Sequence, residues 1–200
     1  MSTSNAFHHG DLKAALTRSA VRIVERSGSE TLSIREVARD AGVSSAAPYR
    51  HFPNKEALLA EVARQGFDRL YDHLVEAGGS LDRQPSFLSR CVAYVHFAQR
   101  HPALYRLMFG AFPDKHRYDG LVEASDRLFT LLNDALAPSP EDRSARAIGC
   151  WAFVHGLAML AIDDQLKMHL PGVDDESLLA VIRPLAEGLI GTMTPVSCKP

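Results

Sequence analysis

Side chains able to contact nucleic acid gather between residues 44 and 55, in the stretch SSAAPYRHFPNK. Its polar members carry hydroxyl, guanidinium, imidazole or ammonium groups: Ser44, Ser45, Tyr49, Arg50, His51 and Lys55. Such groups hydrogen-bond to phosphate oxygens, and arginine also pairs bidentately with guanine. Ala46 and Ala47 are small enough for close approach and for contact with thymine methyl groups. So many phosphate-compatible groups in so short a span favour a DNA-contacting surface over a buried core.

Two short helices around a glycine turn have to position these groups. Ser33 is a good N-cap for a helix over 34–41, and Glu36 three residues later predicts a capping box. Gly42 supplies the tight turn, and Ser44 is expected to cap the next short helix. In a helix-turn-helix the second helix enters the major groove while the first spans the DNA backbone. The alternative is a compact helical hairpin without a ligand, since helix-glycine-helix pairs are widespread.

The rest of the chain has helical periodicity and hardly a strand-like segment. A helix from 11 to 27 ends at Gly28, and Asn54 caps a long helix from 55 to about 77. Proline and glycine breaks then predict further helices at about 84–100, 102–110, 118–137, 141–168 and 174–192. We therefore predict an all-α fold with about nine helices.

The combined motif resembles the DNA-binding segment of tetracycline-repressor-like (TetR) transcriptional regulators. The resemblance rests on TLSIREVA at 31–38, AGVS at 41–44 and YRHFPNKEALL at 49–59, and it extends over about residues 10 to 62. It implies a three-helix DNA-binding domain, expected at 1–56, and a helical effector-binding and dimerisation domain at 57–200. Pro48 departs from the family pattern, in which many relatives have an aliphatic residue, and it predicts irregular helix geometry before Tyr49.

The resemblance also implies roles for single residues. Tyr49, His51 and Lys55 match family positions that contact phosphates. Ser33 matches a small-hydroxyl position at the start of the second helix. Arg35 matches a position from which a side chain can reach the DNA. The positions that face the groove are Ser44, Ser45, Ala46, Ala47 and Arg50. Arg50 is the best candidate for reading a base, with a phosphate contact as an equal alternative.

A ligand site is expected among the helices between residues 84 and 160. Its tentative lining is aromatic, sulfur-containing or imidazole: Tyr94, His96, Phe97, Met108, Phe109, Phe112, Trp151, His155 and Met159. Core packing is the commoner role for each of these residues taken singly. Their types indicate a small hydrophobic or aromatic effector. Trp151, His155 and Gly156 also resemble the Trp–His–Gly signature of one C-terminal subgroup of the family.

The two last predicted helices, 141–168 and 174–192, are expected to form a homodimer. Small residues such as Gly149, Ala152 and Gly156 let a neighbouring helix approach closely. Two copies of the helix pair would make a four-helix bundle between subunits. A symmetric dimer also suits double-stranded DNA with a palindromic operator, because its two heads engage two half-sites.

Composition and charge are compatible with this interpretation. Residues 1–55 contain 8 Lys and Arg against 5 Asp and Glu, a balance of +3, and the remainder contains 14 against 19, a balance of −5. A basic head is suited to phosphate. No apolar run approaches the ~20 residues needed to span a membrane. The N-terminus has no secretion-signal pattern, so we expect a cytoplasmic protein without a membrane partner.

Two other classes of function compete with a ligand-responsive regulator. The sequence has no HExxH, GxSxG or phosphate-loop motif, and this argues against an enzyme. Cys91, Cys150 and Cys198 are odd in number and widely spaced, and so they indicate buried or inert thiols rather than a disulfide framework or zinc site. We expect no metal and no cofactor. A DNA-binding regulator without an effector stays open.

Overall fold

The computed structural model describes residues 9–79, 83–110, 115–135, 140–170 and 172–190. Within these ranges the chain forms eight α-helices and three short 3-10 helices, and no strand. The predicted all-α class is confirmed, and the predicted count of about nine helices is close. The α-helices are α1 (His9–Ser27), α2 (Ile34–Asp40), α3 (Lys55–Ala77), α4 (Arg83–Arg100), α5 (Pro102–Phe109), α6 (Asp119–Ala135), α7 (Pro140–Ile162) and α8 (Asp175–Ile190).

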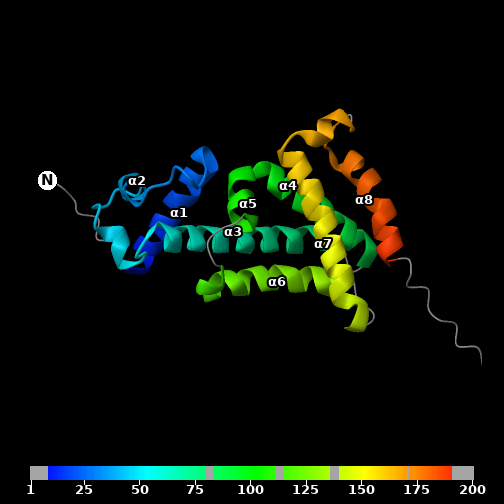
Figure 1. Cartoon of the computed structure of the whole chain (residues 1–200), viewed down its shortest axis with the longest axis horizontal. Helices are drawn as coiled ribbons and strands as arrows, with labels where there is room; N and C mark the ends of the chain where they lie inside the picture. Colours follow the sequence, from blue (N-terminus) through cyan, green and yellow to red (C-terminus); the bar gives the residue numbers. More distant parts are fainter. Residues whose placement is uncertain (1–8, 80–82, 111–114, 136–139, 171, 191–200) are drawn as a thin grey trace, which may run out of the picture. The chain divides into compact units, whose positions relative to one another are not determined.

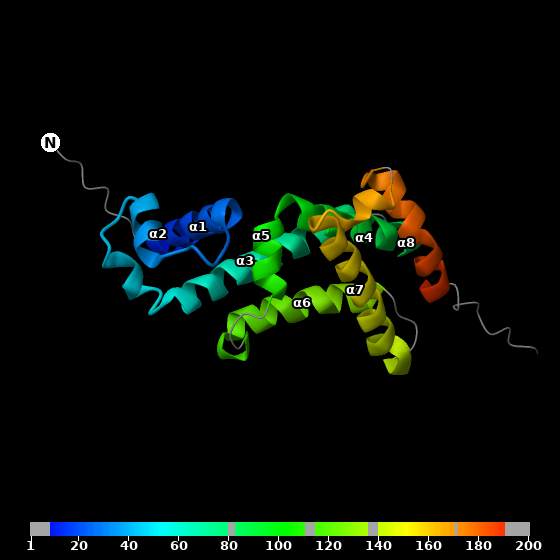
Figure 2. The same cartoon turned by 45° about the horizontal axis from the view of Figure 1, so that its top comes forward.

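By packing, the chain divides into two compact units, and the long helices α3 and α6 belong to both. The first comprises Met1–Phe67 and His101–Ser125, and the second Asp68–Arg100 and Asp126–Pro200. The expected functional division at 56/57 is not tested by this packing and stays a prediction. Figures 1 and 2 give two views of the helices that make up each unit.

The first unit is built around α1, which packs against α2 and α5. The expected apolar face of α1 is buried at Leu16, Ala20, Ile23 and Val24. Helices α3 and α5 approach closely at Gly66, where a Cβ atom would lie only 2.6 Å from Met108 Sδ. A larger residue at position 66 would therefore require the flexible Met108 side chain to move.

The second unit is built around α4, which packs against α7 and α8. Its buried side chains include Tyr94 and Val95 of α4, Val154 of α7 and Leu178 of α8. Cys91 and Cys150 are free and buried here, as predicted, while Cys198 lies outside the described residues. A hydrogen bond with Cys150, together with burial, raises the pKa of the Cys91 thiol. A raised pKa leaves little reactive thiolate.

Helix boundaries mostly follow the predicted breaks. Helix α3 begins at Lys55 and ends at Ala77, and Asn54 caps it by accepting a hydrogen bond from the Ala57 N–H at 2.8 Å. Gly28 ends α1 with φ at +82°. Both capping predictions are confirmed, because they depend on local side-chain and backbone chemistry alone.

The predicted helix over 141–168 was too long. Helix α7 ends at Ile162, the chain turns at Asp164 with φ at +59°, and a separate 3-10 helix follows over Gln165–Met168. Two consecutive aspartates oppose the negative C-terminal end of a helix dipole, and aspartate tolerates the left-handed conformation. Apolar periodicity continues through the turn and conceals it.

Candidate nucleic-acid interface

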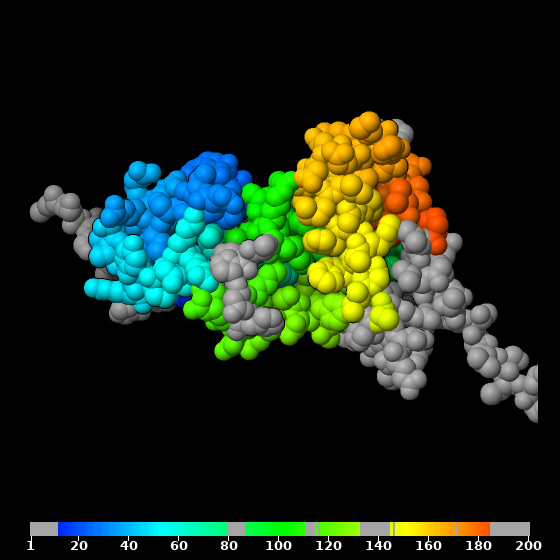
Figure 3. Space-filling model, in the orientation of Figure 1, coloured from blue at the N-terminus to red at the C-terminus, as the bar shows by residue number. Residues whose placement is uncertain are grey.

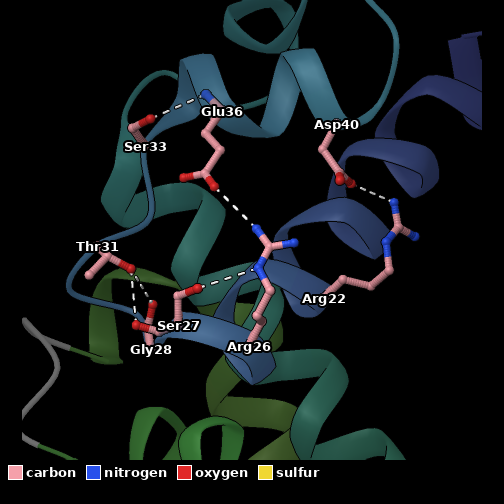
Figure 4. Close-up of polar contacts among 8 residues, drawn as sticks. All are labelled: Arg22, Arg26, Ser27, Gly28, Thr31, Ser33, Glu36 and Asp40. Carbon is pink, nitrogen blue, oxygen red and sulfur yellow. Dashed lines mark hydrogen bonds and ion pairs between the residues drawn. The ribbon is translucent and has the colours of Figure 1, made fainter.

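The predicted DNA-contacting segment, residues 31–55, is here called the reading head. Helix α2 and the turn after it position its exposed side chains. Ser33 caps α2 by accepting a hydrogen bond from the Glu36 N–H at 3.2 Å. Ile34, Val37 and Ala38 are buried and face the core. Only half of the predicted capping box forms, because the Glu36 carboxylate pairs with Arg26 at 3.3 Å (Figure 4). A charged partner on α1 outcompetes the backbone N–H that the box would have used.

Two ion pairs brace α2 against α1. Figure 4 shows Arg22 reaching Asp40 at the end of α2, at 2.6 Å, and Arg26 reaching Glu36 near its start. The hydrogen bond from Arg22, supported by one from Ser19, lowers the pKa of Asp40. Both pairs connect α1 to the helix that precedes the turn, so they add to the contacts that hold α2 against α1.

We expect acid to weaken the Arg22–Asp40 brace. Because the pKa of Asp40 is lowered on folding, the stabilisation is complete above the unfolded pKa and is lost as pH falls through the folded value, below about pH 4. Asp40→Asn should therefore lower the free energy of unfolding at pH 7 by at most ~1 kcal/mol, and by progressively less towards pH 3. Thermal unfolding of both proteins from pH 7 to 3 checks this. A difference that stays constant with pH would contradict it.

The turn after α2 is set by Gly42, whose φ is +70°. The Val43 N–H donates to the Ala38 carbonyl at 2.9 Å and the Gly42 N–H to the Arg39 carbonyl at 3.1 Å. These bonds satisfy the last carbonyls of α2 and redirect the chain. The glycine turn predicted at this position is confirmed.

Gly42→Ala is expected to lower the free energy of unfolding by roughly 1 kcal/mol, because alanine is strained at this positive φ. A Cβ atom at position 42 would meet nothing within 4 Å, so a steric clash adds nothing. Gly42→Asn should lose less, since asparagine tolerates the left-handed region. Chemical denaturation of the three proteins measures the difference. An equal loss in the free energy of unfolding for both variants would show that the positive φ at position 42 does not cause the destabilisation.

The second short helix is a 3-10 helix over Ala47–Arg50, and not an α-helix. Its N-cap is Ala46, which makes no side-chain hydrogen bond, so the predicted cap by the Ser44 side chain is wrong. Ser44 instead accepts a hydrogen bond from the Ala47 N–H through its backbone carbonyl, at 3.0 Å. Pro48 explains the form, because it has no N–H to donate and its ring restricts the preceding turn. The irregular geometry predicted before Tyr49 is confirmed.

Pro48 and Phe52 anchor this segment, and the polar residues around them stay at the surface. Pro48 is buried and the Phe52 side chain is only 3% exposed, with Lys13 Nζ 5.9 Å from its ring centroid. Tyr49 is 52% exposed, so its ring and hydroxyl are open to solvent. The other exposed candidates are Ser33, Arg35, Ser44, Ser45, Ala46 and Arg50, while Ala47 is half-buried.

Lys55 and His51 are more constrained than the sequence suggests. Lys55 Nζ donates to the Glu30 carbonyl at 2.7 Å, which leaves two of its three donors for a phosphate. His51 Nε2 is buried and has no hydrogen-bond partner among the described residues. The imidazole lies at a cleft of about 280 Å³ shared with Lys13, Phe52 and Arg64. A phosphate contact from this ring therefore has to use Nδ1.

Arg39 is a candidate that our sequence reasoning missed. It lies four residues after Arg35 on α2, so both project from one side of the helix, and both are exposed. Neither guanidinium has an ion-pair partner among the described residues, in contrast to Arg22 and Arg26 on α1. The i, i+4 spacing of two arginines at a helix-turn-helix was the signal available in the sequence.

The predicted ligand residues are divided between the two units. Met108 and Phe109 of α5 belong to the first unit, where Phe109 packs edge-on against Phe67 at 5.1 Å between ring centroids. Tyr94, Phe97, Trp151, His155 and Met159 belong to the second unit. Phe112 lies outside the described residues. Within the second unit, Tyr94, Trp151 and His155 are in direct contact.

Tyr94, Trp151 and His155 form a polar aromatic cluster between α4 and α7. Trp151 Nε1 donates to the Tyr94 hydroxyl at 3.4 Å, and the same hydroxyl lies 3.3 Å from His155 Nδ1. Phe129 of α6 packs edge-on against Trp151 at 6.4 Å between ring centroids. The buried hydroxyl of Tyr94 is thus satisfied from within the protein.

Helix α7 exposes an apolar stripe, here called the α7 stripe: Ala145, Ile148, Gly149, Trp151, Ala152 and Leu160. Ile148 is 54% and Leu160 46% exposed, and the face in view in Figure 3 shows α7 in yellow at the surface. Residues 147–162 contain no Asp, Glu, Lys or Arg. A helix that is apolar on all sides is normally buried. The α7 stripe therefore has the character of an interface.

No helix in the described ranges is both long and apolar enough to cross a membrane. The same part of the chain also contains no group of three or more His, Cys, Asp and Glu side chains placed to hold a metal ion.

The sequence matches two family profiles that together cover most of the chain. Residues 16–62 match bacterial regulatory proteins of the tetR family, and residues 87–185 match the tetracyclin repressor-like C-terminal domain. The first includes α2, the turn and the exposed segment before α3. The resemblance of Trp151, His155 and Gly156 to the Trp–His–Gly subgroup is not tested by these matches and stays a prediction.

Among curated relatives, the uncharacterized HTH-type transcriptional regulator YobS of Bacillus subtilis is 24% identical over 175 residues, which is 86% of this chain and 88% of YobS. The nucleoid occlusion factor SlmA of Idiomarina loihiensis is 31% identical over 116 residues, 56% of this chain and 54% of SlmA. The chain thus matches only about half the length of such occlusion factors.

Solved structures share the whole fold. A protein of unknown function from Rhodococcus sp. RHA1 is 32% identical, with a TM-score of 0.80 over 94% of this chain and 100% of that one. The TetR family transcriptional regulator PfmR of Thermus thermophilus has a TM-score of 0.59 at 16% identity, over 90% of this chain and 98% of that one. At this identity the second likeness shows the fold alone.

Proposed function

Because this chain belongs to the tetR family of bacterial regulatory proteins, we propose that it is a ligand-responsive repressor that binds a palindromic operator as a dimer. Its class is that of a DNA-binding transcriptional regulator, and this family membership supports the expectation that it is not an enzyme. Beyond this class, we propose that the operator is palindromic, that binding represses transcription, and that a small-molecule effector controls binding. The compartment is proposed to be the cytoplasm, where the DNA lies.

The observation that carries the DNA-binding proposal is the exposed segment between α2 and α3. Tyr49 and Arg50 project from a short helix whose other face is fixed by buried Pro48 and Phe52. Because the buried side chains hold the segment in place, the exposed hydroxyl and guanidinium groups are positioned to contact DNA. We assign Tyr49, His51 and Lys55 to phosphates and Arg50 to a base edge. Groove-facing positions are Ser44, Ser45, Ala46 and Ala47, with Ser33, Arg35 and Arg39 on the α2 side.

The α7 stripe supports dimerisation through α7 and α8. Members of this family bind DNA and dimerise. Pairing α7 of two subunits would cover Ile148 and Leu160, whose exposure in one chain is costly. Gly149 and Ala152 let the two helices approach closely. Trp151 and His155 lie on the same side of α7, and both contact the Tyr94 hydroxyl of α4. These contacts hold α7 against α4 next to the proposed interface.

Control by an effector would act through α3. This helix begins at Lys55, directly after the exposed segment, and continues without a break to Ala77 in the second unit. A ligand that shifts α3 would change the separation of two reading heads in a dimer, and hence their fit to successive major grooves. The expected effector is small and hydrophobic or aromatic.

A regulator without an effector is the second candidate. It is favoured by the Tyr94 hydroxyl, which is satisfied by Trp151 and His155 and so presents no open polar group to a ligand. In that case the aromatic side chains of the second unit serve packing and dimerisation only.

A reporter fusion tests the sign of control. The DNA upstream of the gene and of its neighbours is fused to a reporter in a strain with and without the chain. Repression predicts higher reporter activity without the chain, and a return to the low level on complementation by the wild type. Lower activity without the chain would show an activator. No change for any of these promoters would count against local regulation.

A further inference from the structure

A cleft of about 270 Å³ opens in the second unit between the end of α3, one face of α4 and the start of α8. Its α4 residues are Ser89, Val92, Ala93, His96 and Arg100, at positions i, i+3, i+4, i+7 and i+11, so they form one continuous side of the helix. Of the ligand residues expected from the sequence, His96 alone is among the residues that line this cleft. It is distinct from the cluster of Tyr94, Trp151 and His155.

Basic and imidazole groups gather on this cleft. His73 comes from α3, and His96 and Arg100 come from α4. Arg100 is exposed, and its guanidinium has no ion-pair or hydrogen-bond partner among the described residues. An arginine presents a planar pair of donors that matches a carboxylate. The Arg100 guanidinium is therefore available to an anion that enters the cleft.

One carboxylate already occupies part of this site. Asp175 Oδ1 of α8 lies 3.3 Å from His96 Nε2, and the Asp175 side chain is 74% exposed. A polar contact this exposed is weak, so an incoming anion can replace it at little cost. Asp175 thus marks where a carboxylate binds against His96, and it competes with any ligand for that place.

The remaining walls of the cleft are apolar. Val92 and Ala93 of α4 are each 7% exposed, and Leu179 of α8 lies opposite. The cleft holds the volume of roughly nine water molecules, below the range of pockets for drug-sized ligands. Its size and lining therefore suit a short apolar group attached to one anionic group.

We propose that this cleft binds a small hydrophobic carboxylic acid. Its carboxylate pairs with Arg100 and displaces Asp175 from His96, and its short carbon chain lies against Val92, Ala93 and Leu179. Because His73 and Ala77 bring α3 into the same cleft, the acid contacts the helix that begins at the reading head. The control of DNA binding by this acid rests on the proposed function, whereas the binding itself does not.

Calorimetric titration of the full chain without DNA tests the site. The probes are sodium hexanoate and benzoate, with acetate, inorganic phosphate, hexanol and hexylamine as comparisons. Hexanoate or benzoate should bind once per chain, at least about tenfold more tightly than acetate or phosphate. Hexanol and hexylamine should not bind measurably. No heat from either acid up to about 10 mM, or tighter binding of phosphate or hexylamine, would overturn the proposal.

Three variants locate the binding. Arg100→Gln should weaken the acid roughly tenfold or more, and Asp175→Asn should strengthen it several-fold by removing the competing carboxylate. Lys167→Gln removes one positive charge from the exposed 3-10 helix after α7 and should leave the affinity unchanged. Circular dichroism confirms that each variant is folded. Equal affinity of the wild type and Arg100→Gln, or weaker binding by Asp175→Asn, would contradict the site.

A mobility shift on operator DNA separates this proposal from the proposed function. The acid should release the wild type from DNA and leave Arg100→Gln bound at the same concentration. Binding of the acid without release would overturn its regulatory role and leave the site standing. A chain that binds no DNA would overturn the proposed function, while the titration would still decide the site.

Discussion

Ile148→Glu combined with Leu160→Glu is expected to make the protein monomeric and to weaken operator binding at least about 100-fold. The two positions lie near opposite ends of the α7 stripe and are 54% and 46% exposed in one chain. In a symmetric dimer each substitution would bury one glutamate from each subunit without an oppositely charged partner. An uncompensated buried charge costs about 3–5 kcal/mol. A 100-fold loss corresponds to about 2.7 kcal/mol, which this cost exceeds.

Analytical ultracentrifugation and fluorescence anisotropy with labelled operator measure the two effects. Val75→Glu is the matched control, since Val75 is a similarly exposed aliphatic residue, 43% exposed, on α3. It should leave both the dimer and the DNA affinity intact. A double variant that stays dimeric would contradict the interface, and a monomer with full operator affinity would contradict the need for two heads.

Arg50→Ala is expected to lose affinity for the operator and to lose sequence preference with it. A bidentate arginine–guanine pair contributes about 1–3 kcal/mol of discrimination, roughly five- to 150-fold between operator and random DNA. Arg50 is exposed at the end of a short helix held in place by buried Pro48. Its side chain is therefore available for a base edge.

Lys55→Ala is the comparison for Arg50→Ala. Lys55 Nζ is held by the Glu30 carbonyl, in a position suited to a phosphate. Its loss should weaken operator and random DNA alike and reduce the slope of log affinity against log salt by about one. Anisotropy titrations on both DNAs at several salt concentrations measure this. An equal loss for Arg50→Ala on both DNAs would make Arg50 a second phosphate contact.

Local signals in the sequence were enough to predict most of the helices. Gly28, Gly42 and Asn54 act on neighbouring backbone groups, so the helix ends they predict were confirmed. The predicted helix over 141–168 failed for the opposite reason. Its apolar residues repeat through a break that depends on the conformation of one residue, Asp164.

Features that depend on distant residues were not predicted. The partner of Glu36 is Arg26 on another helix, and this pairing replaced the expected capping box. Met108 and Tyr94 are both apolar or aromatic at helical spacing, yet they belong to different units. Residue type predicts that such side chains are buried but not which others they meet. The cleft between Arg100, His96 and Asp175 was missed because α4 and α8 are far apart in the sequence.

Within the reading head, the residue types were predicted better than their environments. Tyr49, Arg50 and the two serines are exposed as their proposed roles require. Lys55 is partly engaged by the Glu30 carbonyl, and His51 has its Nε2 buried without a hydrogen-bond partner among the described residues. Arg39 was overlooked because it lies just outside the motif on which the family resemblance rests.

Selection of bound sequences from randomised DNA tests the central claim most directly. We expect enrichment of a palindrome whose half-sites are separated by one or more helical turns of about 10–10.5 base pairs. Two chains should bind each palindrome, and its affinity should fall steeply with salt. Failure to enrich any sequence at low salt, or enrichment of asymmetric sites bound by a single chain, would contradict it.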